Sequence, residues 1–209
     1  MTKLYLIRHG ETEWNAERRM QGHADSPLSA NGKQQAQWLA EALEEVPFDV
    51  ICASSSGRTL QTAAIVKGSR ELSVIVSDQW REMNLGAWEG RISSEIEQLE
   101  PELYDAFWNE PEQYMPRRGE TYADLQRRVL PALEQLVEEH AGKTICLISH
   151  TVTLKVIMAH MENRALANLW KPPYFHPTCL SVVEWKEERP HIVLHADTSH
   201  FREGEPLGR

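Results

Sequence analysis

The sequence predicts an α/β fold, a three-layer α/β/α sandwich around a mixed, mostly parallel sheet, and three observations lead to it. Short apolar runs alternate with polar loops and with helically periodic segments along the first half of the chain. The 209 residues suffice for one buried core, and no internal repeat or low-complexity tract interrupts them. Near the end, two apolar runs joined by a short polar turn predict an antiparallel pair, and therefore a mixed sheet.

The expected elements follow in chain order. Ser29 is placed to cap a helix that runs to about Val46 and stops at Pro47. Another helix begins near Gly57, with Leu60, Ala63, Ala64 and Val66 expected on its inner face; a long helix covers 122–140, and a further one follows His150-Thr151. Strands are expected over 3–8, 49–53, 73–76, 143–149, 179–186 and 191–196, with a tight turn through 187–190.

Residues 92–119 interrupt this alternation. The segment is acidic, is rich in aromatic residues and contains Pro101, Pro111 and Pro116. We expect a helical insertion packed over one edge of the sheet, within a single domain that spans residues 1–209.

Composition restricts the partners that the protein can have. The formal charge of −9 disfavours nucleic acid and anionic membranes, so a phosphate site must be a local concentration of positive groups. The apolar run at the start is too short for a signal peptide, and no later run approaches the length of a membrane helix. Cys52, Cys146 and Cys179 form no CxxC pair and are read as reduced thiols, two of them in strands. We therefore expect a cytoplasmic protein.

Four polar clusters follow the predicted strands: Arg8-His9-Gly10, Ser54 to Arg58, Arg81-Glu82, and Ser149-His150-Thr151. Ligands of open α/β sheets bind beyond the carboxyl ends of the strands, so the fold class brings these clusters to one edge. Guanidinium groups match phosphate oxygens, a neutral imidazole can act as a nucleophile, and a carboxylic acid can protonate a leaving alkoxide. The combination predicts a phosphoryl-transfer site.

The residues around these clusters carry a family pattern. Residues 6–12 (Leu-Ile-Arg-His-Gly-Glu-Thr), followed by Trp14-Asn15, Gln21-Gly22 and residues 25–29, resemble the signature of the histidine phosphatase superfamily, the phosphoglycerate mutase-like group. Supporting blocks come in the family's order at 54–59 with 61–63, 81–82 with 85–90, 119–121 and 149–150. The resemblance covers nearly the whole chain.

The resemblance implies a phosphohistidine mechanism that needs no metal and no cofactor. His9 would be the nucleophile, with its second ring nitrogen donating to a backbone carbonyl. Glu82 would be the general acid and then the base that activates water. The phosphate would be held by Arg8, Asn15, Gln21, Gly22, Arg58, His150 and Thr151. Most relatives carry Gly or Asn where this chain has Thr151, whose methyl narrows the approach.

Other interpretations of single residues stay open. Glu11, Glu13 and Glu89 are alternative carboxylates for the acid, although the first two are better suited to orienting the loop. Near the C-terminus, polar residues recur at His191, His195, Asp197 and His200. A polar strand face explains this pattern better than a set of metal ligands does. A turn before a helix explains Ser54, Ser55 and Ser56 better than a serine nucleophile does.

Three functions compete: a phosphatase, a cofactor-dependent phosphoglycerate mutase, and a non-catalytic phosphate-binding regulatory protein. Arg117 and Arg118 could bind a substrate anion, as a mutase requires. Against this, the chain ends in a short polar tail with Gly204, Pro206 and Gly208, whereas mutases of the family carry a longer tail over the site. The expected pocket wall is aromatic, comprising Phe107, Trp108, Tyr114, Met115, Trp170, Tyr174 and Phe175. We therefore expect a broad-specificity phosphatase that acts on small-molecule phosphate monoesters. The sequence names neither the physiological substrate nor an oligomeric state.

Overall fold

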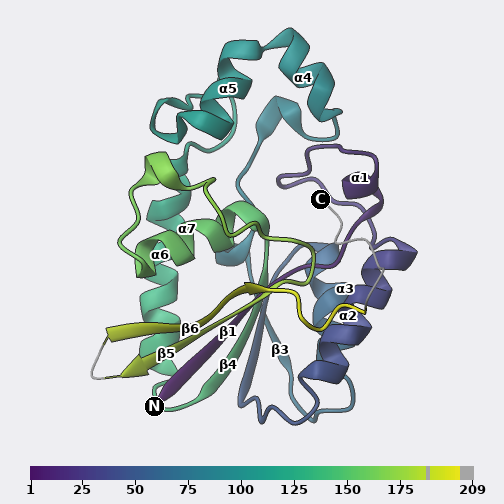
Figure 1. Ribbon diagram of the computed structural model, residues 1–209, viewed down its shortest axis with the longest axis vertical. Helices are drawn as coiled ribbons and strands as arrows, with labels where there is room; N and C mark the ends of the chain where they lie inside the picture. Colours follow the sequence, from purple (N-terminus) through teal and green to yellow (C-terminus); the bar gives the residue numbers. More distant parts are fainter. Residues whose placement is uncertain (187–188, 203–209) are drawn as a thin grey trace.

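The computed structural model describes residues 1–186 and 189–202 and contains a six-stranded sheet in the order β3-β2-β4-β1-β5-β6 (Figure 1). The strands are β1 (Thr2–Arg8), β2 (Val50–Ser54), β3 (Val74–Ser77), β4 (Thr144–Ser149), β5 (Leu180–Lys186) and β6 (Arg189–Asp197). The α-helices are α1 (Glu13–Ala16), α2 (Ala30–Ala42), α3 (Gly57–Lys67), α4 (Ser93–Leu99), α5 (Pro101–Asn109), α6 (Tyr122–Glu139) and α7 (Thr151–Met161).

The pairing of the strands confirms the predicted sheet. β1 with β4, β4 with β2, and β2 with β3 are parallel, whereas β5 is antiparallel to both β1 and β6. The predicted turn through 187–190 is wrong for its second half, because β6 begins at Arg189 and Pro190 pairs with Trp185. Residues 187 and 188 lie outside the described part of the chain.

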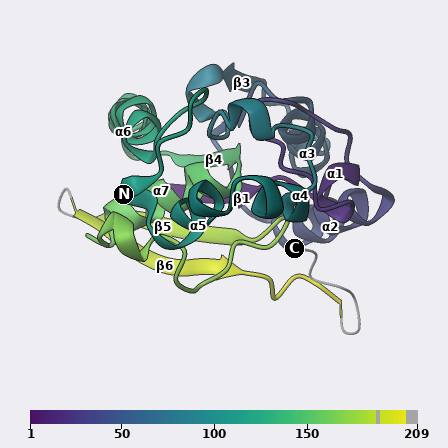
Figure 2. The same ribbon diagram turned by 90° about the horizontal axis from the view of Figure 1, so that it is seen from above.

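Helices cover both faces of the sheet. α2 and α3 lie on one face and α6 and α7 on the other (Figures 1 and 2). Alternate residues of β1 serve the two faces: Leu4 and Leu6 pack with the α6 and α7 side, and Ile7 packs with the α2 and α3 side. Because both faces are buried, the central strands read as continuous apolar runs rather than as alternating ones.

Two expected helix features differ from the structure. α2 ends at Ala42 rather than near Val46, and the guanidinium of Arg70 donates to the carbonyls of Leu43 (2.5 Å) and Glu44 (3.0 Å) after its end. These bonds satisfy carbonyls that a longer helix would have used. On α3, Ala64 is exposed and Leu60 only partly buried, while Thr59 and Thr62 are fully buried in their place.

The segment 92–119 contains α4 and α5, which lie above the carboxyl ends of the strands (Figure 1). Its aromatic residues pack with Trp88 and Tyr122, and Phe107 lies within 6 Å of both rings, at 5.7 and 5.6 Å between centroids. This cluster attaches the insertion to the body of the protein. In the described residues, no helix combines the length and the apolar character that crossing a membrane would need.

Candidate active site

His9 follows β1 directly and lies at the carboxyl edge of the sheet. Its side chain is buried, and its Nδ1 lies 2.7 Å from the carbonyl oxygen of Gly10. A carbonyl only accepts, so Nδ1 carries the proton and Nε2 keeps its lone pair. Burial, followed by the charges of Arg58 and Arg8, lowers the pKa of His9 well below its ordinary value. The imidazole is therefore neutral near pH 7, as a nucleophile must be.

Gly10 allows the turn that gives His9 this geometry. A Cβ at Gly10 would lie 2.5 Å from the carbonyl oxygen of Gly32, at the start of α2. Its N–H donates to Thr62 Oγ1 on α3 (3.0 Å). The loop after β1 is thus held between two helices, which explains why the residue after His9 must be glycine.

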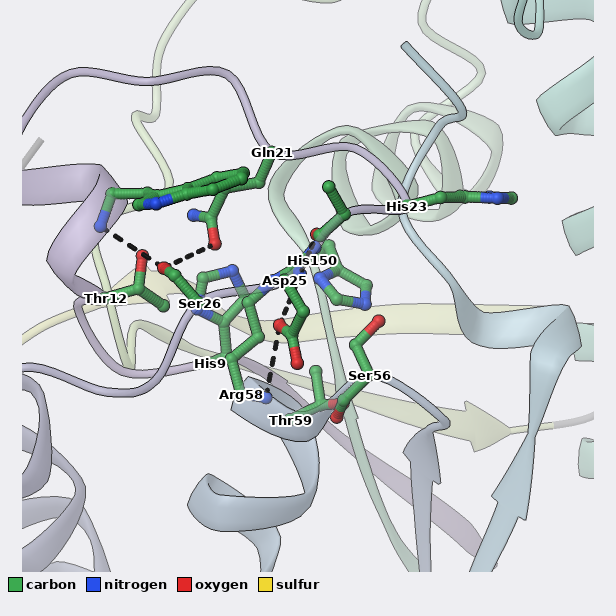
Figure 3. A network of polar contacts seen from close by, with 12 residues as sticks. His9, Thr12, Gln21, His23, Asp25, Ser26, Ser56, Arg58, Thr59 and His150 are labelled. Carbon is green, nitrogen blue, oxygen red and sulfur yellow. Dashed lines mark hydrogen bonds and ion pairs between the residues drawn. The ribbon is translucent and has the colours of Figure 1, made fainter. Parts of the chain in front are cut away.

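Two buried guanidinium groups flank His9. Arg8 donates through Nη1 to the carbonyl of Phe175 (2.5 Å), and Arg58 donates to the carbonyls of Gly22 and Ala24 (2.8 Å each). Figure 3 shows Arg58 reaching from α3 toward Asp25, with which it forms an ion pair at 2.7 Å. Burial lowers the pKa of both guanidinium groups, but from an ordinary value so high that they stay charged at neutral pH. In each, the Nε is buried and has no partner in the described part of the chain.

His150 lies beside His9, with 5.3 Å between ring centroids (Figure 3). Its Nε2 lies 2.8 Å from Ser54 Oγ at the end of β2, whereas its buried Nδ1 finds no partner within the described residues. Burial, followed by the charges of Arg58, His9 and Arg8, holds the pKa of His150 well below its ordinary value. The ring is neutral. Ser54 Oγ also lies 3.4 Å from Ser56 Oγ, and when its hydroxyl donates to the nearer Nε2, the ring proton is on Nδ1.

Glu82 is buried and is held by the first turn of α7. Its Oε1 accepts from the N–H groups of Met83 (3.0 Å) and Thr153 (3.1 Å) and from Thr153 Oγ1 (3.2 Å). Its Oε2 accepts from the N–H of Val152 (3.1 Å). A helix N-terminus favours a carboxylate at this place, because its first N–H groups have no partner within the helix.

The alternative carboxylates have other tasks. Glu89 accepts from the N–H groups of His23, Ala24 and Leu85, and so fixes the loop that carries Gly22. Glu11 accepts from Ser29 Oγ (2.8 Å), and Glu13 is exposed in the first turn of α1. None of the three lines the cleft that contains Glu82.

The remaining predicted phosphate residues also reach this cleft, whose volume is about 1000 Å³. Asn15 uses its amide oxygen to accept from the N–H and Oγ1 of Thr12, and Gln21 accepts from Ser26 Oγ (3.3 Å; Figure 3). Gly22 has φ +57°, and a Cβ there would lie 2.4 Å from Glu89 Oε1. Thr151 is the first residue of α7 and also lines the cleft.

The outer half of the cleft is mostly aromatic. Five predicted wall residues lie there: Phe107, Trp108, Trp170, Tyr174 and Phe175. Two predictions are wrong: Tyr114 is buried beneath Phe107 and Trp88, and Met115 is 67% exposed and does not line the cleft. Arg117 and Arg118, expected as possible anion ligands, are also exposed, and neither of them lines the cleft.

Sequence reasoning missed several neighbours. Tyr104, Lys155, His176 and the pair Arg18 and Arg19 also line the cleft. Lys155 lies in an otherwise apolar helix and was not predicted as a site residue. It follows Thr151 by four residues, so the two lie on the same face of α7, and this spacing could have indicated that Lys155 faces the cleft. Asp25 stood in the quoted motif, but only the structure shows its contact with Arg58.

The C-terminal histidines do not lie together in one site. His195 Nδ1 lies 3.1 Å from Glu162, His200 Nε2 lies 3.2 Å from Thr178 Oγ1, and His191 is exposed. Asp197 accepts from Ser199. Over residues 1–186 and 189–202, no three His, Cys, Asp or Glu side chains are grouped so that they could hold a metal ion. The three cysteines are buried and unpaired, with Cys52 in β2 and Cys146 in β4, as predicted.

Comparison with known proteins decides the family. Residues 4–198 match the family model of the histidine phosphatase superfamily (branch 1). The chain belongs to this superfamily. It is 33% identical over 203 residues to phosphoserine phosphatase 1 of Hydrogenobacter thermophilus, covering 97% of this chain and 96% of that protein. It is 38% identical over 159 residues to a protein named probable phosphoglycerate mutase GpmB from Yersinia enterocolitica, covering 76% and 74% of the two chains.

A solved structure supports the same assignment. YhfR of Bacillus stearothermophilus superposes with a TM-score of 0.93 at 44% sequence identity, covering 96% of this chain and 99% of that one. The predicted fold class and the predicted family are thereby confirmed.

Proposed function

We propose that the protein is a metal-independent phosphatase that hydrolyses phosphate monoesters through a phosphohistidine on His9. One observation carries the proposal: a neutral His9 is surrounded by three buried nitrogen donors without partners in the described residues, Arg8 Nε, Arg58 Nε and His150 Nδ1. Buried donors are almost always satisfied in native proteins, so these three call for a ligand with several acceptors. A phosphoryl group supplies them.

In the first step, the lone pair of His9 Nε2 attacks phosphorus and the bond to the leaving oxygen breaks. The proton stays on Nδ1, which continues to donate to the Gly10 carbonyl, so the ring keeps its orientation. Glu82 enters this step as the carboxylic acid and gives its proton to the leaving oxygen, so that it ends the step as the carboxylate. Among the described residues, its Oε2 accepts one hydrogen bond, from Val152, and is therefore the oxygen with room for that proton.

In the second step, the Glu82 carboxylate takes a proton from water, whose oxygen attacks phosphorus. The bond between phosphorus and Nε2 breaks, its electron pair returns to His9, and inorganic phosphate leaves. Arg8, Arg58 and His150 stabilise the charge on the phosphoryl oxygens in both steps, with Asn15, Gln21, Gly22 and Thr151 completing the cradle.

We also propose broad specificity, a cytoplasmic location and a single domain with the insertion at about 92–119. The aromatic outer half of the cleft supports broad specificity, because rings recognise area more than one particular group. The three free cysteines support a reducing compartment.

A mutase is the second candidate, because relatives bear that name. A mutase must grip the carboxylate of phosphoglycerate and shield the phosphoenzyme from water. Arg117 and Arg118 do not line the cleft, whereas Arg18 and Arg19 do, and the tail with Gly204, Pro206 and Gly208 lies outside the described residues. Water is favoured as the acceptor because the relative named a phosphatase matches 97% of this chain, against 76% for the relatives named as mutases.

Kinetics on a panel of monoesters beside 3-phosphoglycerate test the choice. We expect phosphate release from several esters and no rapid interconversion of 2- and 3-phosphoglycerate. Interconversion without phosphate release would establish the mutase instead.

A further inference from the structure

Lys155 is a buried cation that the proposed phosphoryl-transfer steps do not use. It lies on α7 with 4% of its surface exposed and lines the cleft. Its Nζ lies 3.0 Å from the carbonyl oxygen of Leu169 and 3.3 Å from those of Lys171 and Pro173. An ammonium has three N–H donors, so these carbonyls occupy all of them. None is left for an anion of the substrate.

The same ammonium faces two rings of the cleft wall. Nζ lies 5.6 Å from the ring centre of Trp170 and 5.3 Å from that of Phe175, within the range of cation–π attraction. Both rings line the cleft. Lys155 therefore fixes the backbone of residues 169–173 and also attracts the rings that this segment presents.

Residues 169–175 link the two halves of the cleft. At one end, the carbonyl of Phe175 accepts from Arg8, which flanks His9. At the other, Trp170 Nε1 donates to the carbonyl of Phe107 in α5 (2.8 Å), and its ring lies 4.3 Å from that of Trp108. A shift of this segment would move the aromatic wall relative to the phosphate cradle.

We propose that Lys155 is a positioning residue whose ammonium fixes residues 169–175 as the wall that receives the leaving group, and that it thereby favours phosphate monoesters with a flat, apolar leaving group over small polar ones. The inference rests on the proposed phosphatase function.

The charge of Lys155 gives the inference a test in the unmodified protein. Burial, followed by the charge of Arg164, lowers the pKa of Lys155 to about 8. The ammonium therefore prevails below pH 8, and above it the neutral amine loses one donor and the cation–π attraction.

Four other charged or titratable groups face Lys155: Arg164 and Glu162 after α7, Cys179 before β5, and His195 on β6. Burial raises the pKa of Cys179 to about 12 and lowers that of His195, so neither changes charge between pH 7 and 9.

The experiment compares kcat and KM for 1-naphthyl phosphate, glycerol 2-phosphate and 3-phosphoglycerate in the wild type, Lys155→Met, Lys155→Arg and the control Lys33→Met, whose lysine is exposed on α2. We expect Lys155→Met to lose roughly 10-fold in kcat/KM for the naphthyl ester, mostly through KM, and less than about 3-fold for the glycerol ester. In the wild type, the preference for the naphthyl ester should fall between pH 7 and 9. Lys155→Arg should keep its own preference over that range, because arginine stays charged.

Two outcomes would overturn the inference. Equal losses for both esters would make Lys155 a general structural residue, and a loss confined to 3-phosphoglycerate would make it a ligand of the substrate carboxylate. Labelling of His9 by substrate phosphate is measured in parallel. If the wild type is not labelled, the proposed function fails; if labelling is intact but the preference does not change, only the role of Lys155 fails.

Discussion

The two halves of the cleft are built by different means. The inner half consists of charged and polar groups at or just after strand ends, and its members are fixed by backbone groups and by one another: His9 by Gly10, Arg58 by Gly22 and Asp25, and Glu82 by α7. The outer half consists of rings carried by α5 and by residues 169–175. In the proposed mechanism this difference separates tasks: the inner half carries out the reaction, and the outer half receives the leaving group.

Glu82→Gln should give the largest effect on the reaction itself. In the proposed mechanism it removes both the acid and the base, so we expect steady-state kcat to fall roughly 10²- to 10⁴-fold. p-Nitrophenolate leaves without a proton, so with p-nitrophenyl phosphate the variant should release a burst of one equivalent and then stall as phosphoenzyme. With glycerol 2-phosphate it should show no burst. A kcat near the wild-type value would mean that another group is the acid.

Trp108→Ala tests the outer half. Its ring packs against Phe107 and Trp170 in the wall, so its loss should raise KM for 1-naphthyl phosphate roughly 10-fold and leave kcat nearly unchanged. Steady-state kinetics with glycerol 2-phosphate serve as the control, because a small leaving group does not need the ring. A fall in kcat for both esters would contradict the division of tasks.

Ser54→Ala sharpens the description of the inner half. The variant removes the hydroxyl that pairs with His150 Nε2, so the ring proton is no longer held on Nδ1 and the imidazole loses its donor toward phosphate. We expect kcat to fall by up to about 10-fold, the value of one hydrogen bond, with KM for different leaving groups changed in parallel. The matched control is Ser55→Ala, because Ser55 Oγ donates to Asp78 instead. Equal effects of the two variants would show that Ser54 does not act through His150.

The sequence predicted the inner half better than the outer one, for a physical reason. Arg8, His9 and His150 lie within one residue of strand ends, so the parallel sheet alone brings them to one edge. Whether Tyr114 and Met115 face the cleft depends instead on the path of the chain after α5, and the composition of the segment does not determine this path.

Lys155 is a second residue whose place in the cleft was not predicted from the sequence. A lysine in an apolar helix reads as an outward-facing residue, because charged side chains are rarely buried without partners. Its partners are carbonyls of a segment without regular strand structure, and no residue pattern announces them. The strands and the family motif were therefore accessible from the sequence, whereas the contacts that shape the leaving-group wall were not.

Labelling of His9 tests the central claim most directly. Wild type and Glu82→Gln are mixed with p-nitrophenyl phosphate carrying radiolabelled phosphorus, quenched in alkaline denaturant within the first turnover, and mapped by peptide digestion. We predict label on the His9 imidazole, approaching one equivalent in Glu82→Gln, and neither label nor turnover in His9→Asn. Turnover in His9→Asn, or label on any other residue, would contradict the account.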